Sequence, residues 1–260
     1  MSNEFIKYSV EGSVAKIMLN RPEKFNSFIR EMALQLQDAF DKANADKQVR
    51  AIYLGAEGKA FCAGQDLSEA INPSGPGIKI IVEEHYNRII RKIRTIEKPF
   101  VCAVQGAAAG AGANIALACD VVIASSSAYF SQVFSKIGLI PDSGGTFFLP
   151  RLIGFGKASA LMMLGDKVSA VDAEKMGMIY KVTEDAKLQE EAFSIAKTIS
   201  EMPTVGIGLT KRLLNESMSN SMEQQLESEG KLQEIATHTY DFKEGVKAFL
   251  EKRKPIFKGE

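Results

Sequence analysis

Residues 99–125 read PFVCAVQGAAAGAGANIALACDVVIAS, and this stretch decides the fold class. Its two apolar runs, PFVCAVQG and DVVIAS, are typical of strands buried on both faces. The glycine-rich segment between them leads into an alanine- and leucine-rich run that favours a helix. The stretch therefore predicts a strand, a tight turn, a helix N-terminus and a second strand, which is the repeating unit of an α/β protein.

The same alternation extends toward the N-terminus. VAKIMLN at 14–20 and AIYLGAEG at 51–58 predict strands, and amphipathic patterns predict helices over 27–43 and about 80–96. In the second helix the apolar residues recur every three or four positions, so one face should lie against a sheet. His85 falls on the charged side of this helix, and we expect it to be exposed or at an edge.

The last third of the chain is helical in pattern. Helices are predicted over about 188–202, over 205–239 with possible breaks, and over 241–253. We therefore divide the chain into a core of strand and helix units, residues 1–195, and a helical oligomerisation region, residues 196–260.

Composition excludes several classes of function. Lys plus Arg and Asp plus Glu both number 32 in the 260 residues, so no overall charge attracts nucleic acid or an anionic membrane. There is no N-terminal signal pattern and no apolar run of about 18 residues, so neither export nor a membrane span is expected. Three cysteines without a CxxC pair indicate a reducing, cytoplasmic setting, and two histidines make a metal site unexpected.

Three segments can carry chemistry. KAFCAGQDLSE at 59–69 and GAGAN at 110–114 place small residues at bends, where backbone N–H groups can approach a ligand. KIGLIPDSGGTFFLPRLIG at 136–154 places Asp142 before a glycine pair and a helical pattern. Each segment alone has a simpler interpretation: tight turns and close packing for the first two, and a helix N-cap for Asp142.

All three segments occur in the order seen in one known family. Together with LNRPEKFNSF at 19–28, they resemble the crotonase superfamily, also called the enoyl-CoA hydratase and isomerase family, over essentially the whole chain. The resemblance implies an α/β fold, a crotonase-like spiral of repeated ββα units followed by C-terminal helices that form a homotrimer or a dimer of trimers. It also implies an acyl-CoA thioester as substrate, so coenzyme A enters with the substrate and no separate cofactor is expected.

The resemblance assigns roles to individual residues. The oxyanion hole would consist of the backbone N–H groups of Gln65 and Ala111. Lys24 could meet a coenzyme A phosphate or be an ordinary surface lysine, and Asp66 could contact substrate or only stabilise its own turn. The residues expected to bind substrate or coenzyme A are Lys24, Ala63, Gln65, Asp66, Leu67, Ser68, Ala111 and Phe134. The loop-like stretch at 70–78 is a candidate cover for this site.

Two departures from the family pattern indicate which reaction to expect. Hydratases of the family resemble one another in using two glutamates, and the matching positions hold Asn114 and Phe134. Neither side chain can act as a general base toward water. Asp142 remains as the catalytic acid and base, and one carboxylate suffices to move a proton between two carbons. The sequence therefore predicts an isomerase.

Within the family, FCAGQDL, GAGA and PDSGGT look like the group that isomerises 1,2-epoxyphenylacetyl-CoA to an oxepin and shifts Δ3 double bonds to Δ2. Several alternatives stay open. They are enoyl-CoA hydration, thioester hydrolysis, dehalogenation with His85 as a base, and a non-catalytic trimer that only binds acyl-CoA.

Overall fold

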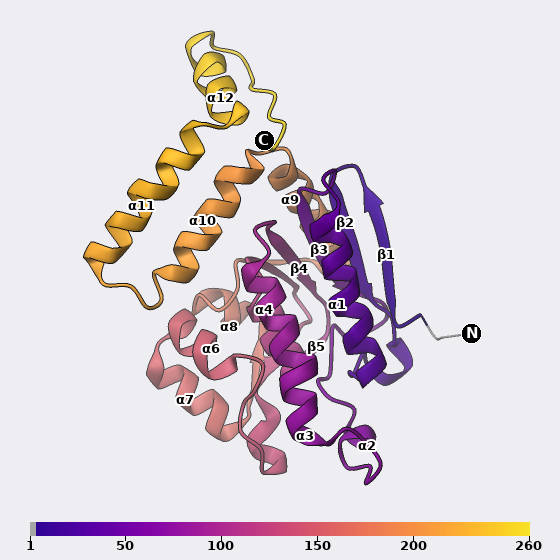
Figure 1. Ribbon diagram of the computed structural model, residues 1–260. Helices are drawn as coiled ribbons and strands as arrows, with labels where there is room; N and C mark the ends of the chain where they lie inside the picture. Colours follow the sequence, from indigo (N-terminus) through magenta and orange to yellow (C-terminus); the bar gives the residue numbers. More distant parts are fainter. Residues whose placement is uncertain (1–3) are drawn as a thin grey trace.

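Two β-sheets form the centre of the molecule in the computed structural model, which describes residues 4–260 (Figure 1). The larger sheet has the strand order β1 (Ile6–Glu11), β2 (Val14–Leu19), β3 (Ala51–Ala56), β4 (Phe100–Val104), β6 (Val121–Ser125), β9 (Lys181–Thr183). β1 pairs antiparallel with β2, and the other neighbours are parallel. The smaller sheet has the order β5 (Ala107–Ala109), β7 (Tyr129–Ser131), β8 (Lys167–Ser169). The predicted α/β class is confirmed.

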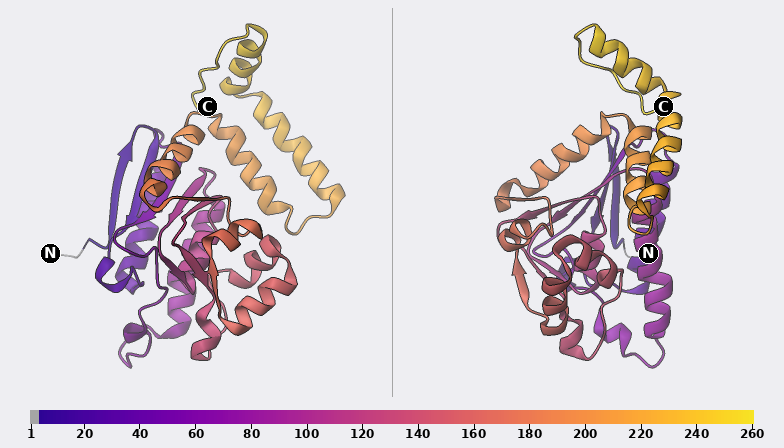
Figure 2. Two further views of the ribbon diagram at one scale, coloured as in Figure 1. Left: turned by 180° about the vertical axis from the view of Figure 1, so that it is seen from behind. Right: turned by 90° about the vertical axis from the view of Figure 1, so that its left-hand side faces the viewer.

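Helices cover both faces of the larger sheet. α1 and α4 lie on one face and α9 on the other (Figures 1 and 2). Because side chains alternate along a strand, β3 sends Ile52 and Leu54 into the core under α1 and α4, and Ala51 and Tyr53 into the core under α9. The helices are α1 (Arg30–Ala45), α2 (Leu67–Ala70), α3 (Gly77–Ile80), α4 (Asn87–Thr95), α5 (Ala111–Leu117), α6 (Gly145–Ile153), α7 (Phe155–Leu164), α8 (Ala170–Lys175), α9 (Leu188–Ser200), α10 (Thr204–Glu216), α11 (Met222–Thr237) and α12 (Tyr240–Leu250), with short 3₁₀ turns η1 (Pro22–Lys24), η3 (Val133–Ile137) and η4 (Asp185–Lys187).

One helix differs from its predicted form. The segment predicted at 80–96 contains a π-helical turn, η2 (Ile81–Tyr86), before α4. A π-turn holds extra residues per turn and changes the direction in which the neighbouring side chains point. His85 is consequently buried, with 0% of its surface exposed, so the expectation of an exposed or edge histidine was wrong. Its Nε2 lies 3.2 Å from Arg30 Nη1, and burial, with the Arg30 charge, holds the pKa of His85 below its usual range.

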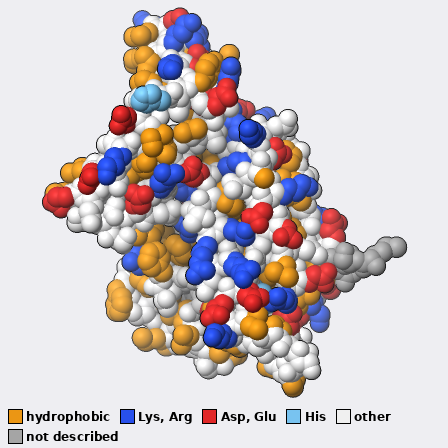
Figure 3. Space-filling view, in the orientation of Figure 1, with side chains coloured by type: hydrophobic (Ala, Val, Ile, Leu, Met, Phe, Trp, Pro, Cys, Tyr) orange, Lys and Arg blue, Asp and Glu red, His pale blue; other side chains and the backbone are white. Residues whose placement is uncertain are grey.

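The C-terminal arm, defined as α10 to α12, projects from the two sheets (Figures 1 and 2). The predicted break in 205–239 lies at residues 217–221, where Ser221 begins α11 with a capping box. Figure 3 shows apolar side chains on the surface of this arm. On α12 (Tyr240–Leu250), Phe249 is 83% exposed and Leu250 is 75% exposed.

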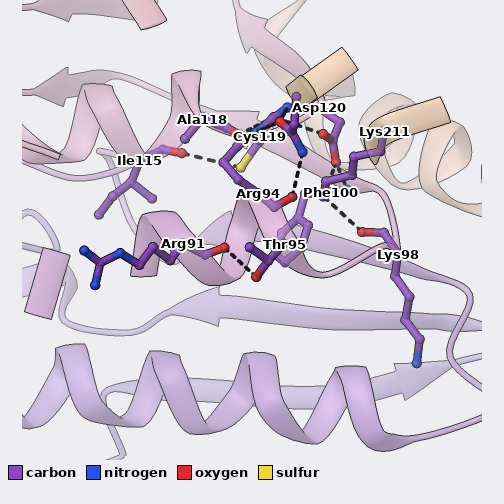
Figure 4. Close-up of polar contacts among 11 residues, drawn as sticks. Arg91, Arg94, Thr95, Lys98, Phe100, Ile115, Ala118, Cys119, Asp120 and Lys211 are labelled. Carbon is purple, nitrogen blue, oxygen red and sulfur yellow. Dashed lines mark hydrogen bonds and ion pairs between the residues drawn. The ribbon is translucent and has the colours of Figure 1, made fainter. Parts of the chain in front are cut away.

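A cluster of charges around one buried lysine attaches the arm to the core (Figure 4). Lys211 of α10 is only 5% exposed and forms an ion pair of 2.8 Å with Asp120, at the start of β6. Asp120 also pairs with Arg94 at 3.1 Å and accepts a hydrogen bond of 2.8 Å from the Phe100 N–H. The Lys211 ammonium lies 4.7 Å from the centre of the Phe100 ring. Each charge in this cluster therefore has an opposite charge beside it.

The short strands escaped the sequence analysis. β5, β7 and β8 have three residues each, too few for a periodic pattern. β1 was also missed. Within residues 4–260, no helix combines the length and the apolar character that crossing a membrane requires.

Candidate active site

Two of the predicted segments lie side by side. Cys62 and Ala108 form a parallel bridge, and the Ala109 N–H donates to Cys62 O at 2.9 Å. A Cβ atom added to Gly64 would lie 3.0 Å from Ala109 O and 3.6 Å from Ala111 N. The turn before Gln65 therefore packs directly against the turn before Ala111.

Glycines make this approach possible. Gly64 has φ +92° and Gly110 has φ +54°, conformations that other residues rarely adopt. Ala111 is the first residue of α5, so its N–H has no partner inside the helix. Neither this N–H nor that of Gln65 donates a hydrogen bond within residues 4–260. Two unpaired backbone donors at neighbouring rigid turns are suited to bind one oxygen atom.

Asp142 belongs to the same site. Its backbone oxygen accepts hydrogen bonds of 2.9 Å from Asn114 Nδ2 and 2.9 Å from the Gly145 N–H. Asn114 lies on α5, the helix that Ala111 begins. The N-cap of α6 is Gly144, and no side chain caps this helix. The alternative interpretation of Asp142 as an N-cap was therefore wrong.

The carboxylate of Asp142 has little to compensate its charge. Oδ1 accepts a hydrogen bond of 2.8 Å from the Ser143 hydroxyl, and within the described chain no Lys, Arg or His forms an ion pair with it. Burial raises the pKa of Asp142, and the Ser143 hydroxyl opposes this only in part. A carboxyl group in such an environment is suited to accept and return a proton.

Asn114 and Phe134 are the residues that the family resemblance matches to the hydratase glutamates. Asn114 is buried, and its Oδ1 accepts a hydrogen bond of 2.8 Å from Gln132 Nε2. Its amide thus joins Gln132 to the Asp142 backbone. Phe134 is also buried, and its ring would lie 3.7 Å from a Cβ atom on Gly110. These two positions place an amide and a phenyl ring near the glycine turns, and neither can ionise.

A hydrogen-bonded clamp on the Gln65 side chain was not predicted. Tyr86 Oη donates to Gln65 Oε1 at 2.7 Å, and Gln65 Nε2 donates to Glu69 Oε2 at 2.9 Å. In the sequence, Tyr86 falls on the apolar face of the helix predicted at about 80–96. Because a buried tyrosine hydroxyl usually needs a partner, Tyr86 was the one available signal for this contact.

The other residues predicted to bind substrate lie near these turns. Lys24 is exposed and makes no ion pair within the described chain, and Ala63, Leu67 and Ser68 are exposed. Asp66 accepts from the Ser68 N–H at 3.0 Å and pairs with Arg21 at 2.8 Å. These contacts match the alternative in which Asp66 stabilises its own turn.

The structure offers little support for catalysis by a cysteine nucleophile or a metal ion. All three cysteines are buried. Burial raises the pKa of Cys62 to about 12, so its thiol is a poor nucleophile. Among the described residues, no group of three or more His, Cys, Asp or Glu side chains is arranged to hold a metal ion.

Comparison with known proteins identifies the family to which the chain belongs. The model of the family described as enoyl-CoA hydratase/isomerase matches residues 9–260. The chain belongs to this family. This chain is 44% identical over 260 residues to the 1,2-epoxyphenylacetyl-CoA isomerase of Escherichia coli, and the match covers 99% of both chains. It is 39% identical over 259 residues to a Rhodobacter capsulatus protein described as a probable enoyl-CoA hydratase, covering 100% of both.

A solved structure of the enoyl-CoA hydratase/isomerase family shares the fold. The crystal structure of a family protein from Mycobacterium abscessus superposes with a TM-score of 0.93 at 37% identity, covering 98% of this chain and 100% of that chain. The predicted crotonase-like fold is thereby confirmed.

Proposed function

We propose that this protein is an acyl-CoA isomerase that uses Asp142 as its only catalytic acid and base. The preferred substrates are 1,2-epoxyphenylacetyl-CoA, converted to the oxepin, and Δ3-enoyl-CoA, converted to the Δ2 isomer. The observation that carries the proposal is a half-buried carboxylate with no ion-pair partner in the described chain, whose backbone is hydrogen-bonded to Asn114 on the helix that Ala111 begins. The Ala111 and Gln65 N–H groups are free to bind an oxygen atom. The 44% identity to the E. coli isomerase supports the choice of ring substrate.

The reaction on an enoyl thioester follows from these groups. The Gln65 and Ala111 N–H groups bind the thioester oxygen and stabilise negative charge as the enolate forms. This acidifies the carbon between the carbonyl and the Δ3 double bond, so Asp142 can remove a proton there. Return of that proton to the far end of the conjugated system produces the Δ2 isomer and regenerates the carboxylate. Each step uses the same side chain.

Hydration requires a general base for water, and the two positions where hydratases carry glutamates do not supply one here. Water must be deprotonated as it attacks, and the positions of the hydratase glutamates hold Asn114 and Phe134. Both ends of the Asn114 amide are also hydrogen-bonded already, since its oxygen accepts from Gln132 and its nitrogen donates to the Asp142 backbone. The proposal therefore favours isomerisation over hydration.

Product analysis tests the proposal. The purified protein and Asp142→Asn are each incubated with a Δ3-enoyl-CoA, its Δ2 isomer and enzymatically generated epoxyphenylacetyl-CoA, and products are followed by absorbance and mass. We expect isomers of unchanged mass from the wild type and none from the variant. A gain of one water on the Δ2 substrate would identify a hydratase, and coenzyme A binding without turnover would identify a binding protein.

We also propose that the C-terminal arm forms a homotrimer or a dimer of trimers. The exposure of Phe249 and Leu250 supports this, because large apolar side chains on a projecting arm are usually covered by a partner. Light scattering should give a mass of three or six chains, and a monomer would contradict the proposal.

A further inference from the structure

The Gln65 side chain is held from two sides, by Tyr86 at the end of η2 and by Glu69 of α2. Tyr86 donates to its Oε1 at 2.7 Å, and Glu69 accepts from its Nε2 at 2.9 Å. Tyr86 is buried and packs edge-on against Phe28, with the ring centroids 5.9 Å apart. The Glu69 carboxylate is itself held by the Arg30 N–H at 3.0 Å. Both ends of the clamp are therefore anchored to the core.

The peptide between Gly64 and Gln65 needs such anchoring. Its N–H is the candidate oxyanion donor, and a peptide that follows a glycine with φ +92° can rotate at little steric cost. On one side its carbonyl accepts a hydrogen bond of 2.7 Å from the Phe28 N–H. On the other side, the clamp on the Gln65 side chain restrains the residue that carries the N–H.

The clamp also joins two distant points of the chain. Glu69 lies at the beginning of the segment 69–86 and Tyr86 at its end, and both bond to the same amide. The residues between them include Ile71 and Ile78, which are exposed. One side chain therefore determines how the base of this segment sits beside the oxyanion turn.

We propose that Tyr86 and Glu69 are positioning residues, which orient the oxyanion donor through the Gln65 side chain and seat the segment 69–86 against it. The inference rests on the proposed function, in which the Gln65 N–H binds the thioester oxygen. Burial raises the pKa of Tyr86 well above its ordinary value, so the hydroxyl stays protonated and remains a donor across the assay range. Tyr86 thus acts through Gln65 and takes no part in proton transfer.

Kinetics of Tyr86→Phe, Gln65→Met and the double variant test the inference. Each single variant should lower kcat for a Δ3-enoyl-CoA about tenfold with little change in KM, because a misplaced donor weakens transition-state binding. The double variant should be no slower than the slower single variant, since both changes remove one contact. The acid limb of the pH profile should stay in place. Additive losses, wild-type rates or a moved alkaline limb in Tyr86→Phe would overturn the inference.

Tyr53→Phe is the matched control. Tyr53 is also buried and donates to a glutamine, Gln189, at 2.5 Å, but it lies in the core under α9. Its loss should leave kcat unchanged. A tenfold loss in this control as well would show that any broken tyrosine–glutamine bond impairs the enzyme, and would overturn the positioning role.

A spectroscopic measurement separates this inference from the proposed isomerase activity. The infrared stretch of an isotope-labelled thioester carbonyl is recorded for bound hexadienoyl-CoA, without turnover. We expect a shift to lower frequency in the wild type and a smaller shift in Tyr86→Phe. An equal shift in both overturns the clamp and leaves the isomerase standing, whereas no shift in the wild type overturns the oxyanion role and the clamp together.

Discussion

The carboxylates of Asp120 and Asp142 have opposite surroundings. Asp120 has Lys211 at 2.8 Å and Arg94 at 3.1 Å (Figure 4). The Asp142 carboxylate accepts from the Ser143 hydroxyl at 2.8 Å and has no ion-pair partner within residues 4–260. The Asp120 carboxylate offsets much of the cost of burying the Lys211 ammonium, so this ion pair joins two parts of the fold. An uncompensated carboxylate costs stability and has a raised pKa, which is the environment that proton transfer requires.

The largest expected difference is in activity. Asp142→Asn should lower kcat for Δ3-enoyl-CoA isomerisation about 10³-fold, within the range typical of a lost general base. Asp120→Asn should change kcat of the folded protein only a few-fold, because Asp120 has no contact with the candidate site. Steady-state kinetics on the two purified variants checks this. A similar loss of kcat in both variants would contradict the proposal that only Asp142 is catalytic.

Stability should change in the opposite sense. Asp120→Asn leaves Lys211 buried without its counter-charge, and we expect the free energy of unfolding to fall by about 3 kcal/mol. Burial places the pKa of Asp142 above its value in the unfolded chain, so the folded chain binds the proton more tightly. The wild type therefore loses stability relative to Asp142→Asn as the pH rises through the folded pKa.

Urea unfolding near neutral pH and at acid pH measures both effects. Asp142→Asn should be at least as stable as the wild type near neutral pH, and this advantage should disappear at acid pH, where Asp142 is protonated in both folded and unfolded chains. A destabilised Asp142→Asn near neutral pH would mean that this carboxylate is structural after all.

Asn114, which bonds to Asp142, and Asn215, which bonds to Arg94, allow the same comparison with smaller expected effects. Asn114→Ala removes the donor to the Asp142 backbone, and we expect kcat to fall about tenfold because the carboxylate is less well placed. Asn215→Ala removes the acceptor for Arg94 in the other cluster, and should lower stability by about 1 kcal/mol without a change in kcat. Kinetics and unfolding measured on both variants should give this crossed pattern, and equal kcat values would contradict it.

The smallest expected effect is a displacement of the pH profile. The Ser143 hydroxyl lowers the pKa of Asp142 against the effect of burial, so Ser143→Ala should raise that pKa further. Asp142 must be ionised to remove a proton, and the acid limb of kcat/KM should therefore move to higher pH. A rate profile measured at constant ionic strength detects the shift. An unmoved limb would indicate that another group titrates.

Local sequence patterns predicted much of the fold. They failed where the structure depends on contacts between segments that are distant in the sequence. The strand, turn and helix of 99–125 are all present, because apolar runs and glycine turns act within a few residues. His85 was misplaced, because a π-turn changes which face of a helix is buried. The strands β5, β7 and β8 were missed, because each depends on its neighbour and has three residues of its own.

By itself the sequence determined the α/β class, the family resemblance and the three segments that supply Gln65, Ala111 and Asp142. Those depend on residue type and spacing, which are local. Only the tertiary structure decided how these groups are held. The bond from Tyr86 to Gln65 joins residues 21 positions apart, and that from Asn114 to Asp142 joins residues 28 positions apart. Contacts of this kind form only when separate elements pack together, so the periodicity of the sequence does not predict them.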